Sequence, residues 1–471
     1  MTQRQKHKDR VAVLALAAML CPGMAQAHAS DQGFVLLLPT DFYITSGTAA
    51  VAASILLVTF LAPRLLGRVF TPVTLGQGWQ AVRPVQITSC LSTAVFFALI
   101  VSGFTGPNDP LSNPLPLAIW TLWWVGLFVV QGVVADVWRW INPWRGIHAL
   151  LAHDIPPLMH LPERWGAWPA VALFMAFQVF VLADIAPSDP ERLALFAAAY
   201  WALTFVGMIL FGGEAWLARV ECFTVLFRLV GSLRAVHLTG PAQIGMPGWA
   251  SLHRPLIPGE AVFCLVILGS GSFDGLHETF WWLGQIGINP LEFPGRSAVV
   301  VQSVLGLIAS NLALIAVFAL AIWLGLALVR RLGQDGCPKF GHAFDAFAIT
   351  ILPIALGYHF AHYLVSFMVQ IQYVAVALND PLARGWTLLG SEAPRVTTGF
   401  LNTTESVRRI WLTQGIAVVA SHILSVLMAH HLAGQMSEGR RDVVLLQVGL
   451  AALMIAYTIF GLWLLAAPRG V

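Results

Sequence analysis

Long apolar stretches alternate with short polar ones along almost the whole chain. Most of them reach roughly 18 residues, the length at which an α-helix can cross the hydrocarbon core of a bilayer. Because lipid offers no partners to backbone N–H and C=O groups, we expect these stretches to be helices. We predict transmembrane helices over residues 43–62, 87–104, 115–135, 168–186, 193–212, 260–273, 298–329, 344–372, 410–433 and 443–466. The predicted fold class is all-α, a polytopic transmembrane bundle of about ten spans.

The composition supports a membrane protein and excludes several other classes. Hydrophobic residues make up 58% of the chain and charged residues 10%, whereas an ordinary soluble domain has about 25% charged residues. The net charge is +3, which leaves no basic surface for a phosphate backbone. We therefore expect the lipid bilayer as a partner and no nucleic acid.

The N-terminus has the pattern of a secretory signal peptide. Basic residues in 1–10 precede an apolar core, 11–20, and an Ala-x-Ala cleavage site ends at Ala27. We predict a signal peptide over residues 1–27 and a single transmembrane domain over 28–471. Cleavage after Ala27 would leave His28 first, and its amino group and imidazole together form a chelate suited to copper. Cleavage after Ala29 fits the same pattern and would remove this histidine.

The distribution of basic residues predicts the orientation of the spans. Loops on one side carry about twice as many Arg and Lys residues as segments on the other, which places that side in the cytoplasm. We expect a protein of the bacterial inner membrane whose mature N-terminus and C-terminus both face the periplasm. Loops 136–167 and 213–258 mix apolar and basic residues, so we predict helices that lie along the inner membrane surface there.

Polar side chains inside the predicted spans are the candidates for function, because they are costly in lipid. His359 and His362 are three positions apart (i, i+3) and therefore share one face of the eighth span. Ser366 and Gln370 continue that face outward. His422 lies at a similar depth in the ninth span, so neighbouring antiparallel helices would bring these histidines together.

A third group of polar residues follows the short sixth span. Asp274, His277 and Glu278 share one face if this segment is helical. Several imidazoles with a carboxylate suit zinc or copper, and a bound metal can generate hydroxide near neutral pH. Asp274 or Glu278 would then orient the attacking water. The predicted metal ligands are His359, His362, His422, His277 and His28. The alternative is that these histidines only form hydrogen bonds between helices.

Several segments in the same order resemble a bacterial family of multi-span membrane proteins known as fenitrothion hydrolases. The matching segments are Ser30 to Pro39, Ala135 to Arg139, Asn142 to Arg145, Ser272 to Gly275, Tyr358 to Tyr363, Asp380 to Leu382 with Gly385 and Trp386, and Trp411 to His422. The resemblance covers most of the mature chain and assigns no catalytic residues. It implies hydrolysis of an apolar organophosphorus triester with release of a nitrophenol, and we expect a metal-bound hydroxide to attack phosphorus.

Two other functions remain open from the sequence. The leading alternative is a transporter of copper or another metal ion, for which a histidine-lined span would be suitable. A carrier needs polar groups along its whole path, yet the inner half of the eighth span, from Phe347 to Leu356, is apolar apart from Thr350 and Pro353. A third possibility is a membrane scaffold for a redox complex, with a membrane or periplasmic protein as its partner.

Overall fold

The computed structural model describes residues 38–61, 63–78, 82–152, 155–334, 336–390 and 395–469. Within these ranges the chain is almost entirely helical, which confirms the predicted all-α fold. The predicted signal peptide and His28 lie outside the described residues.

Eight helical segments in the described ranges are long and apolar enough to cross a membrane. Their helices are α3 (Thr40–Thr59), α5 (Val82–Thr105), α6 with η1 and α7 (Pro114–Pro116, Leu117–Leu127, Phe128–Val133), α11 (Pro190–Phe211), α17 (Val300–Leu332), α18 with α19 (Phe340–Ala348, Ile351–Asn379), α20 (Thr404–Met436) and α21 (Arg440–Ala466). The two remaining predicted spans are also helices. These are α10 (Trp168–Ala183), with 16 residues, and α15 (Glu260–His277), with 18 residues.

Shorter elements connect these helices. The helices among them are α4 (Pro63–Val69), α8 (Trp138–Ile141), α9 (Arg145–Leu151), α12 (Gly213–Arg219), α13 (Cys222–Gly231), α14 (Trp249–Leu252) and α16 (Phe280–Gln285), with 3-10 turns η2 (Glu163–Trp165), η3 (Pro290–Glu292), η4 (Arg296–Ala298) and η5 (Gly399–Leu401). Three strands form a small antiparallel sheet in the order β1-β3-β2. They are β1 (Val73–Gln77), β2 (Val236–His237) and β3 (Pro241–Ile244). The sequence pattern did not predict this sheet.

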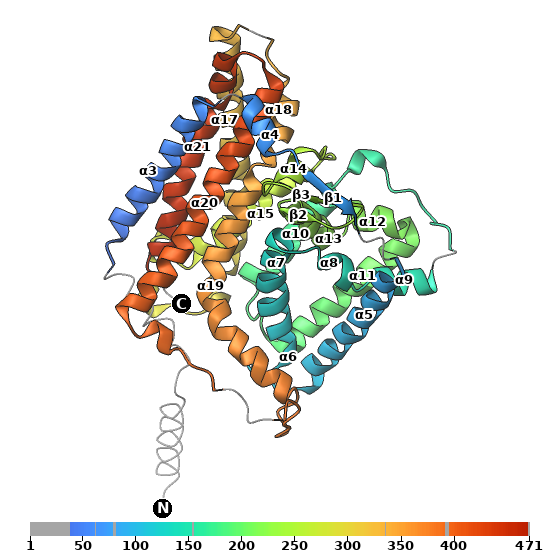
Figure 1. Ribbon diagram of the computed structural model, residues 1–471. Coiled ribbons are helices and arrows are strands. Elements are labelled where there is room, and N and C mark those ends of the chain that lie inside the picture. The colour runs from blue at the N-terminus through green and yellow to red at the C-terminus, as the bar shows by residue number, and fades with distance from the viewer. Residues whose placement is uncertain are drawn as a thin grey trace, which may run out of the picture.

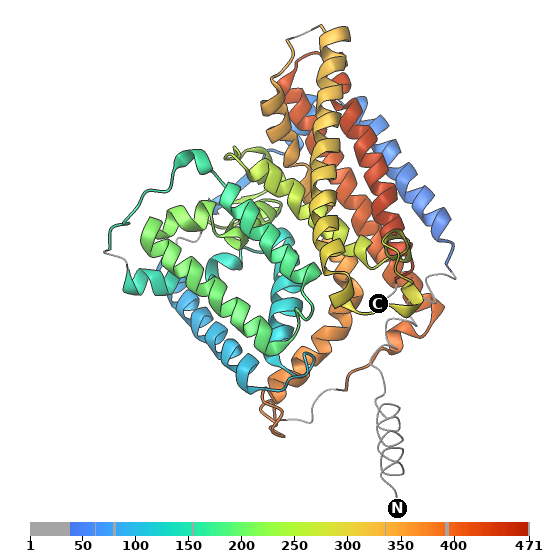
Figure 2. The same cartoon turned by 180° about the vertical axis from the view of Figure 1, so that it is seen from behind.

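The helices form two groups that share α10 and α15 (Figure 1). Helices α3, α17, α19, α20 and α21 form one bundle, in which α21 packs against both α17 and α20. Helices η1, α7, α5 and α11 form a ring beside it, which is seen from behind in Figure 2. Helix α15 packs against α17 and α19 of the bundle, and α19 also packs against η1, so α19 connects the bundle to the ring.

The ends of the long helices meet at two opposite faces of the bundle. At one face, the backbone N–H of Gln334 donates to the Asp442 carboxylate at 3.0 Å, and Arg440 donates to the carbonyl of Thr59 at 3.0 Å. At the other, Phe280 N–H donates to the carbonyl of Pro468 at 3.0 Å. The start of α3 and the end of α21 therefore lie at the same end of the molecule (Figure 1).

Helix α13 lies in the segment 213–258, for which surface-lying helices are predicted, and it is buried in the structure. Every residue of this helix except Arg228 is buried, because α13 packs between α7 and α10. Its polar start is stabilised by Glu221, whose carboxylate accepts from the backbone N–H groups of Phe223 and Thr224 at 2.9 and 2.6 Å.

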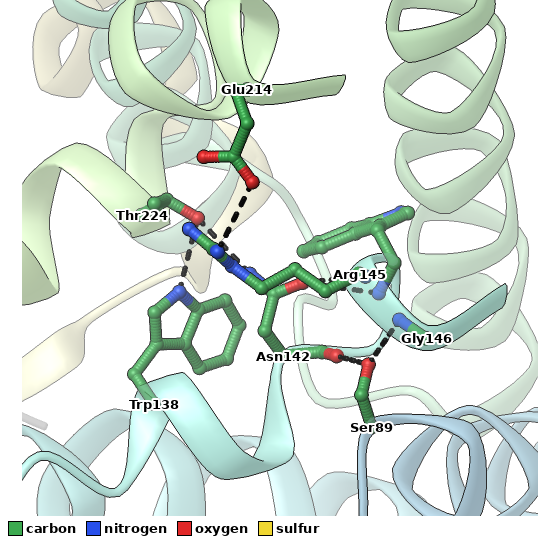
Figure 3. A network of polar contacts seen from close by, with 8 residues as sticks. Ser89, Trp138, Asn142, Arg145, Gly146, Glu214 and Thr224 are labelled. Atoms are coloured by element: carbon green, nitrogen blue, oxygen red, sulfur yellow. Dashed lines mark hydrogen bonds and ion pairs between the residues drawn. The ribbon is translucent and has the colours of Figure 1, made fainter. Parts of the chain in front are cut away.

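Hydrogen bonds of Asn142 join loop 136–167 to helices α5 and α13 (Figure 3). The Asn142 side chain accepts from the backbone N–H of Trp144 at 3.1 Å and donates to the Thr224 hydroxyl at 3.2 Å. Ser89 on α5 donates to the carbonyl of Asn142 at 2.5 Å and accepts from Gly146 N–H at 2.7 Å. Helix α8 and the start of α9 are therefore held against α5 and α13. Leu150 and Leu151 at the end of α9 are exposed, and the predicted membrane-surface position of this segment stays a prediction.

Candidate functional site

Asp274 and His362 are the two predicted site residues that the structure brings into direct contact. Asp274 is in the last turn of α15 and His362 is near the middle of α19, and these helices pack side by side. The Nε2 atom of His362 lies 3.2 Å from Oδ2 of Asp274. Their side chains are 7% and 13% exposed, so the pair is largely shielded from the surroundings.

Tyr363 provides a second hydrogen bond to the Asp274 carboxylate. Its hydroxyl donates to Oδ2 and accepts from the indole Nε1–H of Trp124 on η1, at 3.3 Å. A buried carboxylate is stable only when donors replace its lost hydration. The phenol and the imidazole supply two such donors, and they come from adjacent positions on one helix.

Gly275 makes room for this arrangement. A Cβ atom at this position would collide with the hydroxyl of Tyr358 and would lie 3.6 Å from Nδ1 of His362. Glycine next to Asp274 therefore allows α15 and α19 to approach closely. This explains why an Asp-Gly pair occurs inside an apolar helix.

The C-terminal segment brings a cation to the other side of His362. Nη2 of Arg469 lies 3.4 Å from Nδ1 of His362, and Nη1 lies 3.8 Å from the Glu278 carboxylate. Because a guanidinium can only donate, Nδ1 must accept, which leaves the ring proton on Nε2 facing Asp274. The Arg469 and Glu278 side chains are 22% and 32% exposed, so the site is more open on this side.

A small cavity of about 20 Å³ borders the Asp274–His362 pair. Tyr358, His359 and Tyr363 also line it. A cavity of this volume has space for one water molecule with polar partners nearby. Water can therefore lie next to the carboxylate and the imidazole, but a substrate molecule cannot fit into the same space.

His359 and His277 both form hydrogen bonds to backbone carbonyl groups. Nε2 of His359 lies 3.0 Å from the carbonyl oxygen of Trp124, and the ring stacks on Phe128 with centroids 4.1 Å apart. Nδ1 of His277 lies 2.7 Å from the carbonyl oxygen of Asp274. Since a carbonyl only accepts, each of these nitrogens carries a proton and cannot bind a metal in this arrangement.

His422 forms its hydrogen bond within its own helix. Its Nδ1 lies 2.8 Å from the carbonyl oxygen of Val418 one turn earlier on α20, and its Nε2 is buried without a hydrogen-bond partner. The sequence correctly indicates the burial of this residue. Among the described residues no hydrogen bond joins it to His359 or His362, and the predicted convergence of these three histidines stays a prediction.

The described residues do not provide the predicted metal site. Across these ranges, no three His, Cys, Asp or Glu side chains lie close enough together to hold a metal ion. His362 and Asp274 form a pair, whereas catalytic zinc sites use three protein ligands. His28 lies outside the described ranges, so its predicted role is not tested. We therefore derive no chemical step through a metal.

Three residues around Asp274 and His362 are not predicted from the sequence, namely Tyr363, Arg469 and Trp124. Tyr363 lies in the segment that supplies His359 and His362, Arg469 follows the last predicted span, and Trp124 is one of several aromatic residues in its span. A phenol beside a histidine in an apolar helix is a usable signal. The contacts with Trp124 and Arg469 depend on how distant helices pack.

Comparisons with protein-family models, with curated proteins and with solved structures found no match. Function must therefore be argued from the chemistry of this cluster and from its position in a membrane protein.

Proposed function

We propose that the protein is an integral membrane hydrolase of apolar esters, with organophosphorus triesters such as fenitrothion as the substrate class. The resemblance in the sequence suggests the substrate class, and the Asp274–His362–Arg469 cluster supports the reaction type. Substrates of this kind dissolve in the bilayer. A site among membrane helices could receive them directly from the lipid.

The contact between Asp274 and His362 carries the proposal. A carboxylate that accepts from one imidazole nitrogen orients the ring and leaves the other nitrogen to act as a general base. Asp274 accepts from Nε2–H, so Nδ1 is the base. It removes a proton from water while the water oxygen forms a bond to phosphorus. The bond from phosphorus to the aryl oxygen breaks, and nitrophenolate leaves.

Arg469 provides the positive charge that this reaction needs. Negative charge develops on the phosphoryl oxygen or sulfur in the transition state, and a nearby guanidinium stabilises it. Its position 3.4 Å from Nδ1 of His362 means that it must turn from the ring towards the substrate when the substrate binds. The greater exposure of Arg469 and Glu278 indicates the side from which the substrate approaches.

The test is hydrolysis of fenitrothion by the purified full-length protein, followed by the absorbance of the released nitrophenolate. We expect His362→Gln and Asp274→Asn each to lower kcat at least about 100-fold, since each removes part of the general base. His422→Gln is the matched control, because this buried histidine makes no contact with the pair, and it should retain activity. Wild-type activity in correctly folded His362→Gln protein would exclude the proposal.

Metal-ion transport remains the second candidate because of one feature of α20. The Nε2 atoms of His422 and His430 are both buried without hydrogen-bond partners, and two such nitrogens on one helix could receive a passing cation. We expect copper uptake by vesicles containing the protein to depend on both histidines if this function is correct. Equal uptake by vesicles with the His422→Ala/His430→Ala double variant would reject it.

A further inference from the structure

The small cavity beside Asp274 also borders a polar residue that the proposed reaction does not use. Gln178 lies on α10, which packs against α15, and only 4% of this residue is exposed. Its side chain lines the cavity together with Asp274. Within the described ranges, the Gln178 amide forms no hydrogen bond with the protein. A buried amide without a partner is destabilising, so its presence in an apolar helix requires an explanation.

One oxygen of the Asp274 carboxylate also has no partner in the protein. His362 and Tyr363 both contact Oδ2, and no described residue donates to Oδ1. The described residues include buried polar atoms that are completely enclosed without a partner, such as the Tyr358 hydroxyl, but Oδ1 of Asp274 and the Gln178 amide are not among them. Both groups therefore retain accessible surface, and the cavity is the space that they line in common.

The size of this cavity determines what it can hold. Its volume of about 20 Å³ is enough for one water molecule, which needs at least about 10–15 Å³ and two or more polar partners. A water molecule can donate to Oδ1 of Asp274 and accept from the N–H of Gln178. A metal ion is less suited, because no three His, Cys, Asp or Glu side chains in the described ranges could hold one.

Gly271 keeps this space open. It lies one turn before Asp274 on α15, on the same face of the helix, and it lines the cavity. Apart from its own helix, a Cβ atom there would have a single heavy atom within 4 Å, Cδ1 of Tyr358 at 3.9 Å. Alanine would therefore fit at this position without a collision, and its methyl group would occupy the place of the water.

We propose that Gln178 is a positioning residue for Asp274 and that it acts through one water molecule bound in this cavity. The water gives Oδ1 the donor that it lacks and holds the carboxylate so that Oδ2 faces Nε2–H of His362. It is not the attacking water, because the general-base nitrogen, Nδ1, faces Arg469. The water site rests on the geometry of the cavity, whereas its effect on catalysis rests on the proposed function.

Thermal unfolding of the full-length protein in detergent tests the water site independently of activity. We expect Gly271→Ala to lower the midpoint, because its methyl group expels the water. In a dry cavity the same methyl group would fill a void and replace a helical glycine, and both effects would raise the midpoint. Gly461→Ala on α21 is the control. Its methyl group would make only ordinary contacts, at 3.7 Å or more, and should not lower the midpoint. A higher midpoint for Gly271→Ala would overturn the proposal.

Gln178→Leu tests the amide in the same way. Replacing a buried polar group that has no partner stabilises a protein, so a higher midpoint would contradict the bridging water, whereas we expect a lower one. Gln302→Leu is the control, because Gln302 is only partly buried, on α17, and should have little effect. A wild-type midpoint that is higher in sodium chloride than in choline chloride, with the difference lost in Gln178→Leu, would show a cation in place of the water.

Hydrolysis of fenitrothion tests the effect on catalysis. Gln178→Leu and Gly271→Ala should each lower kcat about 10-fold, as expected for one lost hydrogen bond to a charged group, and leave KM unchanged. Gly461→Ala and Gln302→Leu should keep the wild-type kcat. Wild-type kcat in Gln178→Leu protein with a lowered midpoint would exclude the positioning role. Inactive wild-type protein would reject the proposed function and this role together, while the unfolding midpoints would still decide the water site.

Discussion

At the scale of single residues, Asp274 needs an explanation, because only 13% of its side chain is exposed. A carboxylate among membrane helices is costly unless donors surround it. Tyr363 and His362 are adjacent in sequence and both donate to it, so one turn of α19 supplies both hydrogen bonds. Stability and the chemistry that we propose therefore depend on the same contacts, and substitutions here should affect both.

We expect Tyr363 and Asp274 to be coupled in stability. Tyr363→Phe removes one donor from the buried carboxylate and should destabilise the protein by about 1–3 kcal/mol. In Asp274→Asn protein the same change should cost less, because no charge then needs the donor. Thermal unfolding of the two single variants and the double variant in detergent measures this difference.

Tyr373→Phe on the same helix is the control, and we expect a small effect that is equal in both backgrounds. Additive effects of Tyr363→Phe and Asp274→Asn would mean that the hydroxyl does not stabilise the carboxylate.

The sequence identified part of this cluster, and helix geometry explains the limit. Asp274 and His362 were candidates because ionisable groups are rare in apolar helices, and the structure places them in contact. His359, predicted as a metal ligand, lines the same cavity, but its ring nitrogen is used by a carbonyl of η1. Contacts with Trp124 or Arg469 join helices far apart in sequence, so periodicity within one helix cannot show them.

At the scale of secondary structure, α17 and α21 cross with their backbones in contact. A Cβ atom on Gly449 would meet the backbone carbonyl of Ala321, and one on Gly325 would meet that of Leu446. The two glycines allow the helix backbones to touch, which is how membrane helices gain packing energy without a hydrophobic driving force.

We therefore expect Gly449→Leu to destabilise the bundle by about 1–3 kcal/mol, as overpacking does. The measurement is the thermal transition of purified protein in detergent. Gly341→Leu on α18 is the matched control, because nothing lies within 4 Å of a Cβ there, and it should unfold like wild type. Equal transitions for both variants would show that α17 and α21 can separate without cost.

The apolar pattern predicted where helices occur better than what surrounds them. Each predicted span contains a helix in the structure, because lipid length and backbone hydrogen bonding leave few alternatives. The π-helical form of η1 and the burial of α13 follow from packing against neighbours. The small sheet joins strands near residues 75 and 240, a long-range pairing that short segments do not indicate.

At the scale of the whole molecule, the two ends of the bundle differ in charge. Arg330, Arg331, Arg440 and Arg441 lie near the end where Gln334 contacts Asp442. Arg469 and Glu278 lie at the opposite end, beside Asp274 and His362; we call these four residues the Asp274 cluster. Positive residues accumulate on the cytoplasmic side of membrane proteins, so this arrangement predicts that the Asp274 cluster is nearer the periplasmic face.

Reporter fusions test this orientation. We expect alkaline phosphatase fused after residue 469 to be active and green fluorescent protein fused there to be dark, because both results require a periplasmic location. The same reporters fused after Gln334, in the turn that follows α17, should give the opposite results, since that turn lies at the other end of the bundle. A fluorescent fusion after residue 469 would place the Asp274 cluster near the cytoplasm. Substrates would then have to reach it from the inner leaflet, and the charge distribution would be an exception to the rule from which we predicted the topology.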